Sequence, residues 1–333
     1  MLILQKTIAE RAGVSYATVS RAFTNSAKVK PQTLQRIRNA MRELGIADSD
    51  DVLLGREFVS KAVLLIVSDV SNHFYAKVVR GICDGLEPSG YRVVLCNSGS
   101  DADRELTAME YAEDNRFSGI IMSTVADPER TARFLQSASL PAVLVNRYIP
   151  SLDLDVVRID NYRGGYTAAE HLLEHRHRRI AMLAGIHGSA TATDRARGFR
   201  DAMESHGRSL APEDIQYGDN TWESGYSYAD WLLSRPARYT AVFVGNDYMA
   251  AGMVRRLLEK GRRVPEDYSV VCFDDSYLVN EQGLNVTSIN CDPMLMGRSA
   301  AELFLHRRGD LLGERSRVIY SPRLCVRASV ASL

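Results

Sequence analysis

Tyr16, Ala17 and Arg21 are side chains of the kind that read DNA bases, and they lie within six residues of one another. The guanidinium of Arg21 can form two hydrogen bonds to guanine, which distinguishes bases by about 1–3 kcal/mol. Ala17 can offer only apolar contact, for example to a thymine methyl group. A phosphate contact is the alternative for Arg21. These side chains would reach base edges if Tyr16 and Ala17 open the second helix of a helix-turn-helix.

The residues around them predict a helix-turn-helix over Thr7–Asn25. Ala9 and Ala12 are small enough to let a second helix cross close by. Gly13 supplies a permissive backbone at the turn, and Ser15 is a suitable N-cap for the second helix. In this motif the second helix lies in the major groove of DNA. The candidate DNA-contacting residues here are Ser15, Tyr16, Ala17, Thr18, Ser20, Arg21, Asn25 and Lys28, of which Thr18, Ser20, Asn25 and Lys28 are expected to hold phosphates.

The charge distribution agrees with a DNA-binding head. The 333-residue chain has no formal net charge, yet residues 1–46 carry eight Lys/Arg and two Asp/Glu and are +6. The remaining residues are −6, so a basic head precedes an acidic body, as is typical of nucleic-acid binders. Residues 31–44 alternate apolar and basic side chains and predict a third helix.

From Lys61 onward, short apolar strands alternate with amphipathic helices, which is typical of parallel sheets covered on both faces. We expect two successive α/β lobes, each built on a doubly wound parallel sheet, behind an all-α three-helix head. The predicted domains are a head (1–46), a hinge or linker (47–60) and a two-lobed body (61–333). Residues 291–323 could complete either lobe; we assign them to lobe 1 with residues 61–160, which leaves 161–290 for lobe 2.

The chain resembles the lactose-repressor (LacI/GalR) family of bacterial transcription regulators over nearly its whole length. The head reads A-G-V-S-Y-A-T-V-S-R-A-F from Ala12 to Phe23. Seven body motifs follow in the family's order: Ser68–Tyr75, Val145–Arg147, Ile159–Asn161, Asp194–Phe199, Gly245–Gly252, Val264–Asp275 and Val286–Ile289. Each body motif is weak by itself, but seven in order behind that head indicate the family.

The resemblance implies a periplasmic-binding-protein-like body and a homodimer, or a dimer of dimers, that reads a pseudo-palindromic operator. A small effector between the lobes would change operator affinity through lobe closure. The residues expected to form the effector site are Phe74, Tyr75, Asn146, Arg147, Asp160, Ser189, Thr191, Arg195, Asn220, Trp222, Asn246 and Asp274. For Phe74 and Tyr75, packing of a helix on the sheet is the alternative, and Arg147 could instead be a surface arginine.

The effector chemistry follows from these side-chain types. Arginine, aspartate and asparagine beside aromatic surfaces suit a sugar-like polyol, because each hydroxyl needs a donor or acceptor once water is excluded. A nucleoside or purine is the alternative. Asn220 stands where relatives often have a stacking aromatic residue, which disfavours a flat base and leaves Trp222 as a displaced platform.

The hinge departs from the family pattern. Relatives place a leucine in the minor groove from this segment, whereas here Gly55 occupies the wedge position. Leu53 or Leu54 could take over that role. Three carboxylates, Asp48, Asp50 and Asp51, precede them, and carboxylates near phosphates are unfavourable. We expect weaker bending of DNA here, or bending that depends on a shifted hinge.

Other functional classes are disfavoured by the sequence. Walker, G-x-S-x-G and dinucleotide-binding motifs are missing, so we expect neither an enzyme nor a cofactor. A solute-binding protein shares the body architecture but would lack the basic head. His171 and His175 belong to an H-x-x-E-H pattern that is seen in some zinc proteases. We expect no metal here, because arginines follow the pattern directly and no third ligand is evident. Scattered cysteines and short apolar runs point to a cytoplasmic protein without membrane spans.

Overall fold

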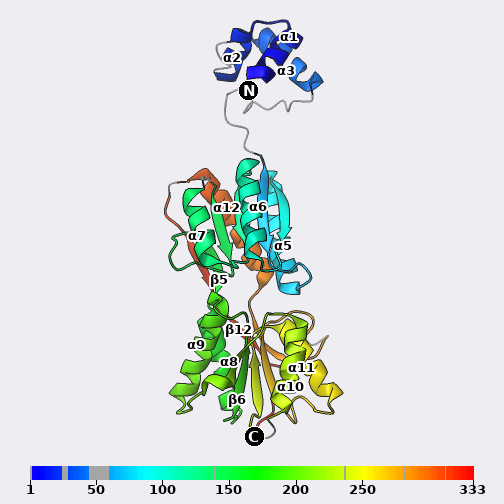
Figure 1. The fold of residues 1–333 in the computed structure, drawn as a ribbon, viewed down its shortest axis with the longest axis vertical. Coiled ribbons are helices and arrows are strands. Elements are labelled where there is room, and N and C mark those ends of the chain that lie inside the picture. Colours follow the sequence, from blue (N-terminus) through cyan, green and yellow to red (C-terminus); the bar gives the residue numbers. More distant parts are fainter. Residues whose placement is uncertain are drawn as a thin grey trace. The chain divides into compact units, whose positions relative to one another are not determined.

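We analysed a computed structural model of the chain, which describes residues 2–24, 29–44, 60–138, 140–235, 238–280, 283–311 and 313–333. Contacts divide the chain into two units, Met1–Ser60 and Lys61–Leu333 (Figure 1). Four sequence-predicted DNA-contacting residues, Asn25, Lys28, Leu53 and Leu54, lie outside the described residues, as does most of the predicted hinge.

The described part of the first unit contains the helices α1 (Leu2–Ala12), α2 (Tyr16–Thr24) and α3 (Pro31–Glu43). Ile8, Val19, Ile37 and Met41 are fully buried and form its core. Gly13 has a φ of 62°, a left-handed conformation that glycine adopts without strain. The Ser15 hydroxyl accepts a hydrogen bond from the Thr18 amide at 3.2 Å, so the predicted N-cap of α2 is confirmed.

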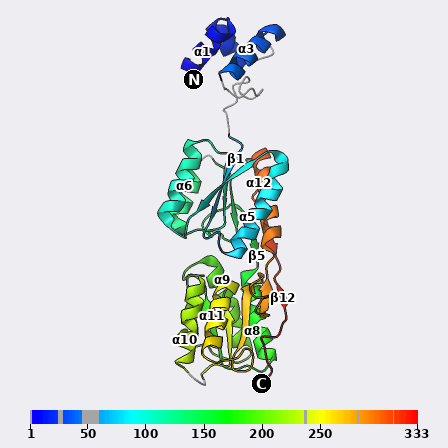
Figure 2. The ribbon, with the colours of Figure 1, turned by 90° about the vertical axis from the view of Figure 1, so that its right-hand side faces the viewer.

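The second unit consists of two six-stranded sheets, one in each lobe (Figures 1 and 2). Lobe 1 has the strand order β11-β5-β4-β3-β1-β2, and lobe 2 has the order β12-β10-β9-β8-β6-β7. The strands of lobe 1 are β1 (Ala62–Val67), β2 (Arg92–Asn97), β3 (Gly119–Met122), β4 (Ala142–Val145), β5 (Asp155–Ile159) and β11 (Arg317–Tyr320). Those of lobe 2 are β6 (Ile180–Ala184), β7 (Ile215–Tyr217), β8 (Ala241–Val244), β9 (Ser269–Asp274), β10 (Thr287–Asn290) and β12 (Arg323–Cys325). Every pairing is parallel except β10 with β12, so the predicted parallel sheets are confirmed apart from one edge strand.

Helices cover both faces of each sheet. In lobe 1 these are α5 (His73–Leu86), α6 (Ala102–Asp114), α7 (Pro128–Ser137) and α12 (Pro293–Gly309); in lobe 2 they are α8 (Asn161–Glu174), α9 (Ala190–Ser205), α10 (Trp222–Leu233) and α11 (Asp247–Glu259). The pairs α5–α12, α8–α9 and α10–α11 pack closely. A Cβ atom on Gly198 would lie 2.0 Å from the carbonyl oxygen of Tyr162, and one on Gly252 would lie 2.1 Å from that of Trp222. Glycine is therefore required where these helix backbones meet.

The chain crosses between the lobes three times, after β5, after β10 and after β11. The returning helix α12 is fixed to lobe 1 by a buried ion pair, in which Arg307 donates to Asp155 at the start of β5 over 2.6 Å. Arg307 also donates to three backbone carbonyl groups, those of Asp310, Gly313 and Glu314, at 3.0 Å or less. All three connections between the lobes follow the carboxyl end of a strand, and we call this region the junction.

Candidate functional site

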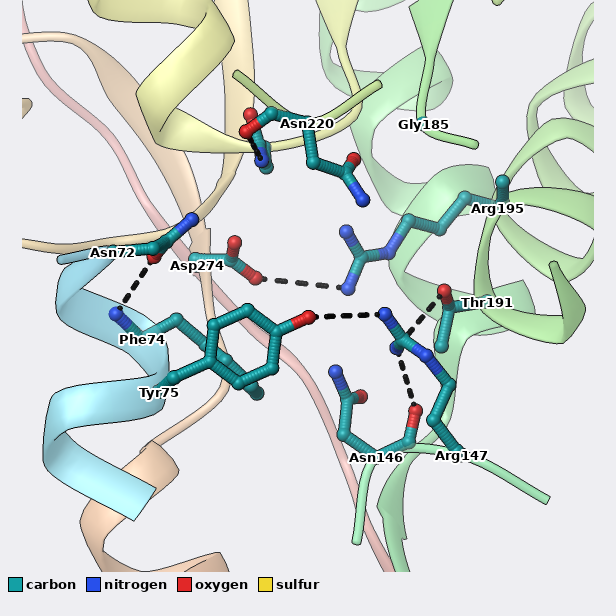
Figure 3. Close-up of a pocket in the computed structure, with 12 residues that line it drawn as sticks. Asn72, Phe74, Tyr75, Asn146, Arg147, Gly185, Thr191, Arg195, Asn220 and Asp274 are labelled. Carbon is teal, nitrogen blue, oxygen red and sulfur yellow. Dashed lines mark hydrogen bonds and ion pairs between the residues drawn. The ribbon is translucent and has the colours of Figure 1, made fainter. Parts of the chain in front are cut away.

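A pocket lies between the lobes, beside the carboxyl ends of strands from both sheets (Figure 3). This is where open α/β sheets bind ligands. Lobe 1 contributes residues that follow β1 and β4, and lobe 2 contributes residues that follow or end β6, β7, β8 and β9. The lining residues are Asn72, Phe74, Tyr75, Asn146, Arg147, Gly185, Thr191, Ala192, Arg195, Asn220, Asn246 and Asp274. The cavity volume is about 30 Å³, which is room for one water-sized group.

Arg147 connects the two lobes. Its guanidinium donates to the Tyr75 hydroxyl at 3.2 Å within lobe 1 and to the Thr191 hydroxyl at 3.2 Å in lobe 2. It also donates to the backbone carbonyl of Asn146 at 2.9 Å. The residue is 8% exposed, so these contacts are shielded from water. All three hydrogen-bond acceptors of Arg147 are neutral oxygens, which a ligand hydroxyl could replace.

Arg195 is held entirely within lobe 2. Its Nε donates to Asn161 at 2.8 Å, another nitrogen donates to the carbonyl of Gly245, and a third lies 3.6 Å from the Asp274 carboxylate. The guanidinium lies over the ring of Phe273, 3.5 Å from its centroid. Burial lowers the pKa of Arg195, and the charge of Asp274 partly opposes that shift. The side chain is therefore fixed in place before any ligand arrives.

Two carboxyl groups lie at the base of this arrangement. Burial raises the pKa of Asp274, and the charges of Arg195 and Arg147 act against the rise. Asp247, the first residue of α11, accepts a hydrogen bond from the Ser276 amide at 2.8 Å. Burial, followed by the nearby charge of Asp274, raises the pKa of Asp247 to about 7. Asp247 does not line the pocket, so this pKa shift belongs to a buried carboxyl group beside the lining residue Asp274.

Backbone strain is concentrated among the lining residues. Asn146, Asn220 and Asp274 have φ values of 55°, 70° and 92°, in the left-handed region that non-glycine residues seldom adopt. Such strain is characteristic of functional sites. The side-chain oxygen of Asn146 is also buried without a hydrogen-bond partner among the described residues. A buried acceptor without a donor favours a ligand that brings one.

Nine of the twelve sequence-predicted effector residues line this pocket: Phe74, Tyr75, Asn146, Arg147, Thr191, Arg195, Asn220, Asn246 and Asp274. The other three lie outside it. Asp160 caps α8 by accepting from the Arg163 amide at 2.9 Å, and Ser189 caps α9 by accepting from the Ala192 amide at 3.3 Å. Trp222 stacks on Tyr226 in α10 with ring centroids 4.9 Å apart. Its ring is thus engaged within its own helix.

Three lining residues were missed by the sequence reasoning: Asn72, Gly185 and Ala192. Asn72 both lines the pocket and caps α5, since its side chain accepts from the Phe74 amide at 3.0 Å. Its place as a capping residue directly before the aromatic pair was a usable signal. Gly185 follows β6 directly and so could have been inferred from the strand end.

In the first unit, the described part of the predicted DNA-contacting set lies on or next to α2. Ser15, Tyr16, Ala17 and Arg21 are exposed, and Thr18 and Ser20 are half-buried. Val19 and Ala22 face the core instead. The helix therefore presents one face to solvent with the side chains that the sequence reasoning singled out.

The chain is similar to known proteins over both of its units. Residues 6–47 match the model of bacterial regulatory proteins of the lacI family, and residues 169–330 match the periplasmic binding protein-like domain. The regulator CelR of Thermobifida fusca, an HTH-type transcriptional regulator, is 32% identical over 332 residues, covering 97% of this chain and 96% of CelR. The chain belongs to the LacI family of bacterial regulatory proteins.

Two further comparisons support the whole-length match of this LacI-family regulator. The transcriptional repressor PurR of Haemophilus influenzae (strain PittEE) is 28% identical over 331 residues, which is 98% of each chain. The solved complex of the regulator CelR with cellobiose is 31% identical, covers 98% of this chain and 99% of the other, and superposes with a TM-score of 0.74. The protein is therefore a DNA-binding transcription regulator with a periplasmic-binding-protein-like domain, and not an enzyme. Among its described residues, no helix is long and apolar enough to cross a membrane.

Proposed function

We propose that this regulator is a repressor whose operator affinity changes when a sugar-like effector binds between the lobes. The observation that carries the proposal is the convergence of Arg147, Arg195, Asn146, Asn246 and Asp274 on one pocket. Guanidinium groups, amides and a carboxylate together supply donors and acceptors for adjacent hydroxyl groups. A polyol loses its water shell on entry, so each of its hydroxyls needs such a partner.

A sugar is favoured over a nucleoside by the aromatic groups. Phe74 and Tyr75 meet edge to face, with ring centroids 5.2 Å apart, and the Tyr75 hydroxyl is used by Arg147. Trp222 stacks within α10 instead of lining the pocket. A nucleoside base binds best by stacking on a free aromatic face, whereas a sugar binds through hydrogen bonds to many polar groups. The solved CelR relative binds cellobiose, which agrees with this assignment.

The mechanism is a population shift between separated and closed lobes. A cavity of about 30 Å³ is too small for a monosaccharide, so the effector enters only when the lobes separate. Hydroxyl groups of the effector then take the place of Tyr75 and Thr191 as partners of Arg147. An effector shifts the equilibrium only by its difference in affinity for the two states. Arg147 supplies that difference, because it reaches across the junction.

We further infer that the regulator is a homodimer in the cytoplasm that reads a pseudo-palindromic operator through α2. Two helices related by two-fold symmetry read half-sites about one helical turn of DNA apart. Val94 and Leu95 are exposed on the edge strand β2, at 40% and 44%, and Leu258, Tyr277 and Leu284 are exposed in lobe 2. Exposed apolar side chains on both lobes fit an interface between two copies.

The effector proposal is tested by thermal denaturation of the full chain with sugars, sugar acids and nucleosides. A ligand that binds only the folded protein raises the melting temperature by mass action. The compound that raises the melting temperature most is then titrated into the parent protein and into Arg147→Gln, for which we expect at least tenfold weaker binding. Stabilisation by nucleosides but not by any sugar contradicts the sugar assignment.

The DNA proposal is tested separately, by fluorescence anisotropy with the regulator's own upstream DNA at several salt concentrations. Specific binding that weakens steeply with salt is the expected result. A chain that binds this DNA no better than a scrambled duplex at low salt contradicts the repressor assignment.

A further inference from the structure

A second and larger cavity lies between the lobes, with a volume of about 530 Å³. Its size is within the range of sites that hold small molecules. Leu144, Ile149 and Val156 of lobe 1 form an apolar floor, and charged residues of both lobes line the rest. An apolar floor with a few polar groups is the usual composition of a ligand site.

Arg158 is an unusual residue for its position in this floor. It lies on β5, which is an inner strand between β4 and β11, and its neighbours Val157 and Ile159 are fully buried on the opposite face. Inner strands of parallel sheets are normally apolar throughout. Arg158 nevertheless points a guanidinium at the cavity, with its side chain 26% exposed.

The donors of Arg158 are largely unused. Its closest ionic partner is Asp194, at 3.9 Å, and its guanidinium lies 5.0 Å from the ring centroid of Tyr148. Arg158 forms no side-chain hydrogen bond with any residue that the structure describes. A partly buried guanidinium with free N–H groups is a ready partner for a carboxylate or phosphate.

Lobe 2 presents a second arginine to the same carboxylate. Arg197 donates to one oxygen of Asp194 at 3.2 Å, and the Tyr148 hydroxyl donates to the other at 3.0 Å. Asp194 thus lies between arginines of different lobes and can balance only one of their two charges. Asp160, the other carboxylate of the cavity, is already used to cap α8. With Arg317, three arginines and two aspartates line the cavity, so its lining carries one net positive charge.

We propose that this cavity is a second ligand site, which binds an amphipathic anion: a carboxylate or phosphate ester on an apolar carbon body. The anionic group contacts the unused N–H groups of Arg158 and the exposed guanidinium of Arg197, and the carbon body contacts Leu144, Ile149 and Val156. The inference rests on this cavity alone and stands whether or not a sugar binds in the first pocket.

The site is placed to communicate with the first pocket. Asp194 and Arg195 are consecutive on α9, and Asp194 lines the second cavity while Arg195 lines the first. An anion that holds Arg158 and Arg197 together fixes the two lobes relative to each other. Coupling between the two ligands is then expected, and it must be reciprocal.

The test uses 8-anilino-1-naphthalenesulfonate, a fluorescent amphipathic anion, titrated into the full-length protein. We expect one saturable site, and at least tenfold weaker binding in Arg158→Gln and in Arg197→Gln. Arg263→Gln, which removes the same charge from an exposed position of lobe 2, should bind as the parent does.

Competition distinguishes the sources of the anionic group. 1-Naphthyl phosphate and 1-naphthoate should each displace the probe, and their relative affinities show whether phosphate or carboxylate is preferred. Neutral 1-naphthol should not displace it. If Arg158→Gln lowers the melting temperature strongly, Arg197→Gln carries the test, because its side chain is 59% exposed. Equal binding by the parent and both arginine variants overturns the proposal. So does the lack of any saturable site.

Discussion

The guanidinium of Arg195 lies 3.6 Å from the carboxylate of Asp274, and both side chains are 8% exposed. Asp274 ends β9 in a left-handed conformation, while Arg195 comes from α9. The pair thus joins a helix to a sheet edge beneath the first pocket. Because both charges are buried, each depends on the other for compensation.

Asp274→Asn should therefore be strongly destabilising. The substitution keeps the side-chain shape but leaves Arg195 buried without its counter-charge, at a cost of about 3–5 kcal/mol in the free energy of unfolding. Asp230→Asn is the matched control, because Asp230 is 48% exposed in its pair with Arg256; it should cost about 1 kcal/mol or less. Urea unfolding measures both, and equal losses would contradict the buried-pair interpretation.

Asp247 should make stability depend on pH. Its folded pKa of about 7 lies above the ordinary value of 3.8, so the folded protein binds this proton more tightly than the unfolded chain does. The bound proton of Asp247 therefore contributes to the free energy of unfolding in full below about pH 4, and this contribution is lost as the pH rises through 7. Asp247→Asn should flatten this decline between about pH 4 and pH 7 in urea unfolding experiments. A decline of equal slope in parent and variant would show that another group is responsible.

Arg21 should determine sequence preference at one operator position. A bidentate contact to guanine predicts that Arg21→Ala loses about 1–3 kcal/mol and accepts other bases at that position. Anisotropy with a set of singly substituted operators measures this effect. A phosphate contact predicts the opposite pattern, in which affinity falls equally for all sequences and the salt dependence becomes shallower.

Gly198 should tolerate no larger residue. The added Cβ of Gly198→Ala would lie 2.0 Å from the carbonyl oxygen of Tyr162, so α8 and α9 must separate. Overpacking of this kind costs about 1–3 kcal/mol or more. Gly309→Ala is the control, since a Cβ there would meet nothing within 4 Å. Thermal unfolding should show a large loss for the first variant and little change for the second.

Much of the fold could be predicted from the sequence because apolar runs are local signals. The strand Asp155–Ile159 is harder to predict, since Asp155 and Arg158 interrupt its apolar pattern. Asp155 is acceptable there only because Arg307 neutralises it from 152 positions away, which no local pattern reveals. Thr287 and Ser288 obscure β10 in the same way, because both are buried polar residues whose side chains bond to residues distant in sequence.

The first pocket was largely predictable because family motifs mark the strand ends. Trp222 was a reasonable candidate platform, but its ring stacks on Tyr226 four residues later in the same helix. The second cavity was not predictable, because Arg158 meets Asp194 only once the lobes are assembled. Spatial proximity across a junction cannot be read from spacing along the chain.

The triple crossing between the lobes also governs the order in which they can form during synthesis. Until residues 293–320 have been made, lobe 1 lacks α12 and β11, so β5 remains an edge strand and the glycine-lined face of α5 has no partner. Lobe 2 in turn awaits β12, which comes later still. Neither lobe is complete before residues 293–325 leave the ribosome, and the two halves of the body mature together instead of one after the other.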